Sequence, residues 1–215
     1  MAAKKDVAEE GGSRQAAYSA RNRARLVKDA QEVLAEIGPT ATIEQIAAHA
    51  EVSPTTIYKY FEHKDILFVE ALSQAWFGFL IWANEQKAPG DRLERTLDSG
   101  RKLFWARQTH PLFANMLHNC LNEMSDFLIQ SDRGEGKKVF KELAASGDLK
   151  QEDFEQRWIL WQNLYNAILK SVFVTEELTP SEAEIALGIG LSVWGISEAK
   201  AKKLISRPLI YTPVE

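Results

Sequence analysis

The stretch VSPTTIYKYFEHKD, residues 52–65, decides the fold. Ser53 is a preferred N-cap residue, and Pro54 follows at the first helical position, where proline is favoured, so a short helix is expected to begin here. Ile57 and Phe61 are the apolar positions that would bury this helix. The other side chains are hydroxyls, phenols and one lysine: Thr55, Thr56, Tyr58, Lys59 and Tyr60. So polar an outer face indicates a partner outside the chain.

A second short helix is predicted just before this stretch, over TIEQIAAHA, residues 42–50. Thr42 occupies the N-cap position, and Gln45 three residues later completes a capping box. The apolar face of this helix consists of Ile43, Ile46, Ala47 and Ala50. The tight turn EVS separates the two helices.

A longer first helix is predicted over residues 15–37, and Gly38 is its expected left-handed stop. Its buried stripe, at spacings of three and four residues, consists of Leu26, Ala30, Val33, Leu34 and Ile37. Two short helices that are joined by a tight turn and braced by a longer one form a helix-turn-helix.

A helix that enters the DNA major groove needs a polar outer face and an N-terminal end that reaches base edges. Thr55 and Thr56 are expected at bases, and Lys59 at a guanine edge or a phosphate. Tyr58 and Tyr60 are suited to donating hydrogen bonds to phosphates. Cations of the first helix would add nonspecific attraction: Arg14, Arg21, Arg23, Arg25 and Lys28. The alternative is a capped surface helix with no such partner.

Residues 25–72, RLVKDAQEVLAEIGPTATIEQIAAHAEVSPTTIYKYFEHKDILFVEAL, resemble the DNA-binding region of TetR-family transcriptional regulators. The resemblance implies that Thr42 and Lys64 contact phosphates and that Tyr58 and Tyr60 hold the DNA backbone. It places five residues at or near bases: Ser53, Pro54, Thr55, Thr56 and Lys59. It also implies a small core of Ile46, Ala47, Val52, Ile57 and Phe61.

The family pattern differs from this sequence at three positions. Glu51 stands where glycine is usual in the turn, Pro39 where an aromatic residue is common, and His63 where a small N-cap residue is usual. A non-glycine residue at a left-handed position costs about 1 kcal/mol.

The composition is that of an ordinary soluble globular protein, with 215 residues, 45% hydrophobic residues and a net charge of −4. The longest apolar run, AWFGFLIWA over residues 75–83, is shorter than the roughly 20 residues of a membrane span. The start of the sequence has no apolar leader segment. A single cysteine cannot form an internal disulfide. These features favour a cytoplasmic protein with no membrane partner.

The expected fold is all-α, with about nine helices and no alternating strand pattern. Residues 1–14 are expected to be a disordered tail and residues 15–62 a three-helix DNA-binding domain. Residues 63–204 are expected to form a larger helical domain for ligand binding and dimerisation, and residues 205–215 a C-terminal tail. In the family, the helix after Lys64 links the two domains.

All six tryptophans lie beyond residue 75. They could form a large core or line a pocket for an apolar or aromatic effector. The expected walls are helices over residues 91–109 and 151–176, with Gln108 and Gln162 either orienting the ligand or lying in solvent. The predicted lining residues are Phe104, Gln108, Phe113, Met116, Trp158, Gln162 and Tyr165.

The segment EAEIALGIGLSVWGISEAKAKK, residues 182–203, carries small residues at helical spacing. Such a stripe allows close approach of another helix, and a two-fold dimer would match a palindromic operator. The predicted interface consists of Gly188, Leu191, Ser192, Gly195 and Ala199. The alternative is a helix that belongs to the core of one chain.

No metal or cofactor is expected, because His110, His118, Cys120 and Glu123 have no ligand spacing of a known metal site. Cys120 is expected to be a small buried hydrophobe. No catalytic residues are expected either, since the sequence contains no nucleophile–base pair, phosphate loop or zinc motif. An enzyme built on a helical scaffold is therefore disfavoured.

The function predicted from the sequence is a DNA-binding regulator, a ligand-responsive repressor that binds a palindromic operator as a homodimer. Its partners would be double-stranded operator DNA and a small effector. The alternative is a helical small-molecule-binding or interaction protein whose DNA-binding head is weak or vestigial.

Overall fold

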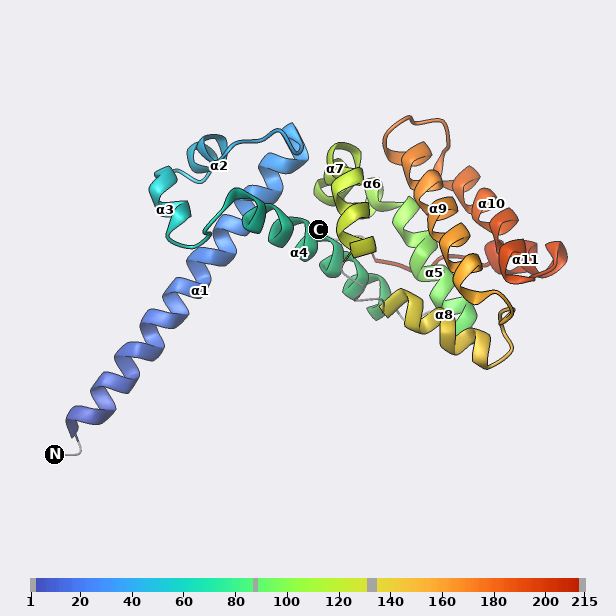
Figure 1. The fold of residues 1–215 in the computed structure, drawn as a ribbon, viewed down its shortest axis with the longest axis horizontal. Helices are drawn as coiled ribbons and strands as arrows, with labels where there is room; N and C mark the ends of the chain where they lie inside the picture. Colours follow the sequence, from blue (N-terminus) through green and yellow to red (C-terminus); the bar gives the residue numbers. More distant parts are fainter. Residues whose placement is uncertain (1–2, 87–88, 131–134, 213–215) are drawn as a thin grey trace.

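The computed structural model describes residues 3–86, 89–130 and 135–212, with side chains from residue 15 onward except at 126–135 (Figure 1). Within these ranges the chain forms α-helices, one 3-10 helix and no strand, which confirms the all-α prediction. The head contains α1 (Ala3–Ile37), α2 (Ile43–His49) and α3 (Pro54–Tyr58). The body contains α5 (Arg92–Phe104), α6 (Ala106–Thr109), α7 (Pro111–Gln130), α8 (Glu135–Ala145), α9 (Phe154–Phe173), α10 (Pro180–Gly190), the 3-10 helix η1 (Leu191–Trp194) and α11 (Glu198–Ile205). Between head and body runs α4 (Lys64–Glu85).

Both predicted caps of the helix-turn-helix are present. The Thr42 hydroxyl accepts a hydrogen bond from the Gln45 amide at 3.3 Å, and the Gln45 side chain accepts one from the Thr42 amide at 2.8 Å. Ser53 Oγ accepts from the Thr56 amide at 3.2 Å. Ile57 is completely buried, so α3 is fixed through its inner face.

The turn between α2 and α3 places Glu51 in the left-handed region, with φ of 55°. Gly38, the predicted stop of α1, is also left-handed, with φ of 79°. Glycine adopts this conformation without steric penalty, whereas the Cβ of a glutamate opposes it. The left-handed position of this turn is therefore occupied by a strained residue.

The N-terminal end of the chain differs from the prediction, whereas the C-terminal end is non-helical as expected. α1 begins at Ala3, so the backbone of residues 3–14, expected to be a disordered tail, continues the helix. The first residues are rich in alanine, lysine and glutamate, which favour helix, and the glycine pair at 11–12 does not end it. The C-terminal segment is non-helical at 207–212 and is docked on the body. The Thr212 amide donates to Gln86 Oε1 at 3.1 Å, and Trp82 Nε1 donates to the Thr212 carbonyl at 3.2 Å.

The helix predicted over residues 182–203 is broken, so the small-residue stripe does not lie on one helix. α10 ends at Gly190, η1 follows, and Gly195 is left-handed with φ of 75° before α11 begins. Gly188 is buried, and a Cβ placed on it would lie 2.7 Å from Ile205 Cδ1. Leu191 is completely buried. Gly188 and Leu191 therefore serve packing within one chain, which corrects their assignment to a dimer interface; Ser192, Gly195 and Ala199 are exposed.

The predicted helix over residues 91–109 is also divided, because Trp105 leaves the helical conformation between α5 and α6. Two of the six tryptophans form a core with phenylalanines at the far end of the body. Trp194 is buried, with ring centres 5.2 Å from Phe140 and 5.4 Å from Phe154. Trp161 is buried beside it. For these two tryptophans the core interpretation is confirmed.

α4 is the one helix in the described ranges that is long and apolar enough, at 22 residues, to cross a membrane by composition alone. Its contacts account for the apolar composition differently. The helix packs against α1, α5 and α7, and its first turn belongs to the head (Figure 1). Its apolar side chains thus join the two parts of the molecule.

We predict that Glu51→Gly raises the free energy of unfolding by about 1 kcal/mol, because it removes the left-handed strain. Urea denaturation followed by tryptophan fluorescence measures the change. Ala48→Gly, at an exposed position inside α2, is the control and lowers stability by about 1 kcal/mol. If Glu51→Gly lowers the free energy of unfolding as Ala48→Gly does, the turn is not strained.

Candidate DNA-binding surface and its connection to the body

The outer face of the helix-turn-helix is formed by the side chains that the sequence assigned to DNA. Thr42, Ser53, Thr55, Tyr58 and Lys59 are exposed, with Tyr58 at 51% of its full accessibility. Pro54, Thr56 and Tyr60 are half-buried. The predicted residues therefore lie on one small unit, and its inner side is the buried core of Ile46, Ala47, Ile57 and Phe61.

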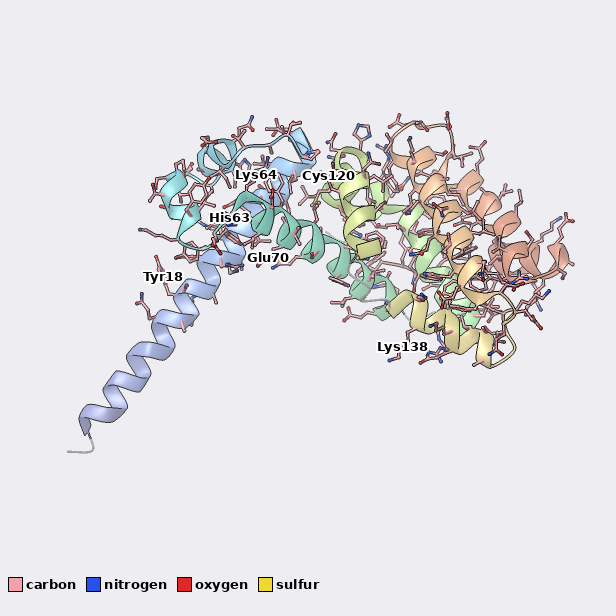
Figure 2. All side chains as sticks on the ribbon, viewed as in Figure 1. Tyr18, His63, Lys64, Glu70, Cys120 and Lys138 are labelled. Atoms are coloured by element: carbon pink, nitrogen blue, oxygen red, sulfur yellow. The ribbon has the colours of Figure 1, made fainter. Side chains whose placement is uncertain are left out.

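Lys64 lies differently from the other predicted DNA contacts. Its ammonium group is 3.4 Å from the Pro39 carbonyl and 4.6 Å from the centre of the Phe68 ring. The side chain is thus turned back onto the head (Figure 2). His63, the N-cap of α4, makes no capping hydrogen bond through its side chain. The first amides of α4 are therefore left for an external acceptor, such as a phosphate.

Arg23 clamps the two residues that follow α3, Tyr60 and Phe61, a role that the sequence analysis missed by grouping Arg23 with the attractive cations. Its guanidinium lies 4.1 Å from the centre of the Phe61 ring and donates to the Tyr60 carbonyl. The same group forms an ion pair of 2.5 Å with Glu70 of α4. Asn22 Nδ2 donates to the Tyr60 hydroxyl at 3.1 Å. α1, the end of α3 and α4 are thus locked together.

A second polar link joins α2 to α1. His49 Nε2 lies 2.8 Å from Glu32 Oε2, and the ligand atoms of Asp29, Glu32 and His49 lie within 4.8 Å of one another. The sequence analysis did not bring these three residues together, because they come from two helices. The close pair of His49 and Glu32 attaches α2 to α1, and this contact by itself accounts for the cluster of the three residues.

The head meets the body where the end of α1 packs against α7. Asn119 Nδ2 donates to the Ala35 carbonyl at 2.7 Å. The next residue, Cys120, departs from helical geometry with φ of −128°, and its thiol lies 3.7 Å from the Leu34 carbonyl. Burial raises the pKa of Cys120 to about 12, so the thiol stays protonated. Cys120 is the buried small residue that the sequence predicted, located at a kink that contacts the head.

α4 is held at its other end by aromatic rings and by one buried lysine. The Phe79 ring stacks on Phe113 of α7 at 5.0 Å, and Trp82 lies 4.4 Å from His110. Lys102 of α5 donates to the Ala83 carbonyl at 2.8 Å and to the Gln86 carbonyl at 3.2 Å. Burial lowers the pKa of Lys102, which shows that the charge is held in a poorly solvated place.

A buried ionic network surrounds this lysine and joins α5 to α10 and to the C-terminal segment. Arg101 donates to Asp98 at 3.0 Å and to Glu184 at 2.9 Å, and also to the Arg207 carbonyl at 2.9 Å. Glu184 accepts a further hydrogen bond from the Trp105 indole at 2.8 Å. Burial raises the pKa of the Asp98 carboxyl against the opposing pull of Arg207 and Arg101. The interior of the body is therefore more polar than the sequence suggested.

The predicted ligand-lining residues are spread over the body. Phe104 and Tyr165 lie together, with ring centres 5.8 Å apart, and the Tyr165 hydroxyl donates to the Gly100 carbonyl at 2.8 Å. Phe113 and Met116 are buried on α7, and Trp158 packs on Phe140. Gln162 is half-buried, whereas Gln108 is exposed on the short α6.

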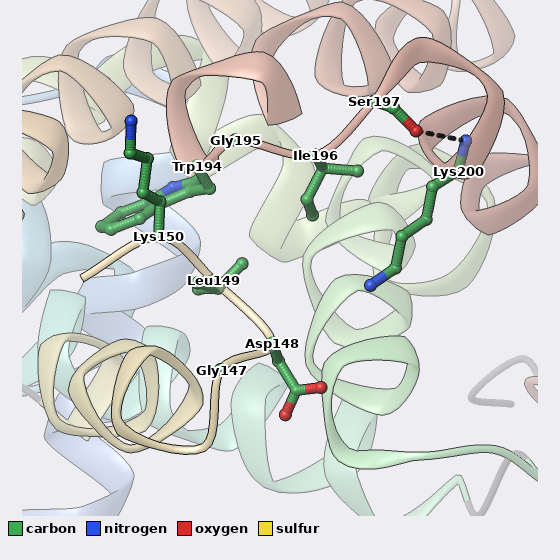
Figure 3. A pocket seen from close by; sticks show the side chains of 9 residues that line it. All are labelled: Gly147, Asp148, Leu149, Lys150, Trp194, Gly195, Ile196, Ser197 and Lys200. Atoms are coloured by element: carbon green, nitrogen blue, oxygen red, sulfur yellow. Dashed lines mark hydrogen bonds between the residues drawn. The ribbon is translucent and has the colours of Figure 1, made fainter. Parts of the chain in front are cut away.

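A hollow of about 370 Å³ lies elsewhere, between the loop before α9 and the loop before α11 (Figure 3). Its lining includes Asp148, Lys150, Trp194 and Lys200, and the Lys150 amide donates to the Trp194 carbonyl at 2.9 Å. None of the predicted ligand residues lines it. It is open and partly formed by loop backbone, unlike the enclosed apolar sites that small ligands prefer.

Residues 26–71 match the family model described as bacterial regulatory proteins of the TetR family. Among solved structures, RolR in complex with resorcinol is similar with a TM-score of 0.70 and 19% identity, over 90% of this chain and 97% of that one. SmeT, the repressor of the Stenotrophomonas maltophilia multidrug efflux pump SmeDEF, has a TM-score of 0.64 and 15% identity, over 80% of this chain and 89% of the SmeT chain. A TetR-like transcriptional regulator from Rhodococcus sp. RHA1 has a TM-score of 0.56 and 21% sequence identity, over 80% of this chain and 92% of that chain. No curated protein matches the chain in sequence.

The exposed helix-turn-helix and its match to the family model indicate a DNA-binding head of the kind found in bacterial regulatory proteins. The similar solved structures show that the helical body shares their fold. The structural likenesses extend over most of the chain, and the sequence match covers the head. Residues 26–71 are thus similar to the N-terminal region of TetR-family bacterial regulatory proteins, and most of the chain shares the fold of the solved structures named above.

We predict that Arg101→Met lowers the free energy of unfolding by about 3–5 kcal/mol, because the buried Asp98 and the largely buried Glu184 lose the guanidinium that pairs with both carboxylates. Arg92→Met on the same helix is the control. It removes a surface ion pair with Glu142 and costs at most about 1 kcal/mol. Urea denaturation measures both, and similar losses would show that the network does not hold the body together.

Proposed function

We propose that the protein is a cytoplasmic repressor that binds a palindromic operator as a homodimer and is controlled by a small apolar or aromatic effector. The observation that carries the proposal is the division of α3 into two faces. Ile57 and Phe61 are buried, while Thr55, Tyr58 and Lys59 are presented outward. A vestigial head would not need both caps and the Arg23 clamp to hold so polar a surface.

In the proposed complex, α3 enters the major groove. Thr55 and Thr56 contact base edges together with Ser53 and Pro54, and Lys59 reaches a guanine or a phosphate. Tyr58 and Tyr60 contact the DNA backbone, where they set the position of α3 rather than its sequence preference. Thr42 and the amide of Lys64 contact phosphates at the starts of α2 and α4.

Control by an effector is proposed to act through the two joints between body and head. One joint is the α7 kink at Cys120 against the end of α1, and the other is α4, held by Lys102 and Phe113. Two recognition helices in a dimer must be about 34 Å apart, or a multiple of this, to enter successive turns of the major groove. A shift of α7 or α5 therefore moves the two α3 helices of the proposed dimer relative to each other, and this change of spacing alters DNA binding.

The effector is proposed to bind between α5, α7 and α9, near Phe104, Met116 and Tyr165. Aromatic side chains and one hydroxyl favour an apolar or aromatic molecule with a polar group. Burial raises the pKa of Tyr165, so its hydroxyl stays neutral. RolR, similar in fold, has been crystallised with resorcinol, which is consistent with an aromatic ligand in such a body.

The dimer is proposed to form through exposed apolar side chains of α9 and α10, here called the α9–α10 face: Ile159, Leu160, Ala167, Ile185 and Ile189. Ile189 keeps 72% of its accessibility within one chain. The two helices pack closely, because a Cβ on Gly190 would overlap with Leu164 Cδ2. Clustered exposed aliphatic residues on adjacent helices are typical of a subunit interface.

We predict that wild-type protein enriches a palindromic site from genomic fragments and that Tyr58→Ala with Lys59→Ala abolishes the enrichment. Loss of each good contact costs about 1–3 kcal/mol, so the double variant binds the selected duplex at least about tenfold more weakly. Both side chains are exposed, so the fold is retained.

The matched control is Lys138→Ala with Lys202→Ala, also two exposed side chains, one on α8 and one on α11 of the body. Fluorescence anisotropy at fixed salt measures each affinity. A folded wild-type dimer that enriches no site, or a double variant that binds as well as the control, contradicts the proposal.

We predict that Ile185→Glu with Ile189→Glu converts the dimer to monomers, because burying two carboxylates on the two-fold axis is unfavourable. Sedimentation velocity measures the mass. Ile210→Glu, an exposed isoleucine on the C-terminal segment, is the control and leaves the dimer intact. A monomeric wild type, or a dimer that survives the double substitution, excludes the α9–α10 face.

A further inference from the structure

The exposed side of α1 carries a line of side chains that the helix-turn-helix does not use. Tyr18, Arg21, Arg25 and Lys28 follow spacings of three, four and three residues, which place them on one helix face. All four are exposed, with Tyr18 at 58% of its accessibility. We call this set the α1 stripe. Arg23 and Leu26, which attach α1 to the head, lie on other faces of the helix, and Asn22 lies one turn from Tyr18 at the edge of the stripe.

The charge of this segment is opposite to that of the whole chain. Residues 15–28 contain four cationic residues and no acidic residue, although the protein has a net charge of −4. Arg23 is used in the ion pair with Glu70, which leaves the three cations of the stripe. Lys28 has a carboxylate nearby, Glu32 at 3.9 Å, but its side chain remains 71% exposed. A basic surface in an acidic protein marks the attraction of a polyanion.

The position of the stripe indicates which polyanion it meets. Asn22 and Arg23 bind the Tyr60 hydroxyl and carbonyl, so α1 leaves the head beside the end of the recognition helix. From there α1 projects past α3 and away from the body, with Tyr18 on the projecting part (Figures 1 and 2). With α3 in a major groove, this part of α1 lies beside the duplex that flanks the site.

We propose that the α1 stripe is a second DNA contact, which binds phosphates flanking the site read by α3. The stripe extends over the eleven residues from Tyr18 to Lys28, a helix rise of about 15 Å, and duplex DNA of this length carries about nine phosphate charges. The three cations attract phosphates, and the Tyr18 hydroxyl donates a hydrogen bond to one. The contact is independent of base sequence, because phosphates carry no direct sequence information. The inference rests on the proposed function in taking α3 as the element that enters the groove.

The test compares full-length wild-type protein with the triple variant Arg21→Ala, Arg25→Ala, Lys28→Ala. Alanine keeps the helix, since its helix propensity is the highest. The matched control, Lys200→Ala, Lys202→Ala, Lys203→Ala, removes the same charge from exposed positions on α11. The probes are two 40-base-pair duplexes, one with the site selected by the wild type and one with shuffled sequence. Anisotropy titrations over a salt series give affinity and salt dependence.

We expect the triple variant to bind both duplexes about tenfold more weakly than wild type and control at low salt. The slope of log K against log salt falls by about 0.9 for each phosphate that the variant no longer neutralises, up to about 2.7 per chain. The preference for the selected over the shuffled duplex stays unchanged. Hydroxyl-radical footprinting shows weaker protection of the DNA outside the selected site.

A triple variant with the affinity and salt slope of the control overturns the inference, even if the wild type selects a site. Failure of the proposed function gives a different result, in which the wild type selects no site. The shuffled duplex then still tests the stripe, because its contact does not depend on sequence.

Discussion

The burial of Ile57 and Phe61 is the interaction on which the function of this protein depends. A helix of five residues is not stable by itself in water, so α3 depends on the burial of Ile57 and on its packing against α2. Arg23 completes this hold from α1 through Phe61 and Glu70. The outer face can then consist of residues that contribute little to stability and are free to serve recognition.

The same constraint explains how the body can act on the head. The head is joined to the body through the continuous α4 and through the extensive contact of α1 with α7. Its position is therefore determined at the body end, where Lys102 and Gln86 hold α4 and the C-terminal segment reaches the same place through Thr212. The buried network around Arg101 fixes these attachments relative to α10 and thus to the proposed dimer face.

The head was largely predictable from the sequence, because caps and turns are local. Thr42, Ser53 and Gly38 each specify a backbone conformation within a few residues, and all three do so in the structure. The body was less predictable, since its polar network joins Arg101 to residues about 80 to 106 positions away. The prediction of a dimer interface from the stripe of small residues failed for a related reason. Spacing along a sequence assumes one helix, whereas Gly190 and Gly195 divide this one.

The cluster of cationic residues in α1 was recognised from the sequence, but its members have two different roles in the structure. Arg23 and Arg25 are two residues apart in the sequence, yet one is enclosed by Phe61 and Glu70 and the other faces solvent. Only the packing of α1 separates the clamp from the stripe. The acidic overall charge limits nonspecific attraction to DNA, so in the proposed complex the α1 stripe beside α3 attracts DNA where α3 can read it. Orientation on the duplex then follows from where the few positive charges lie.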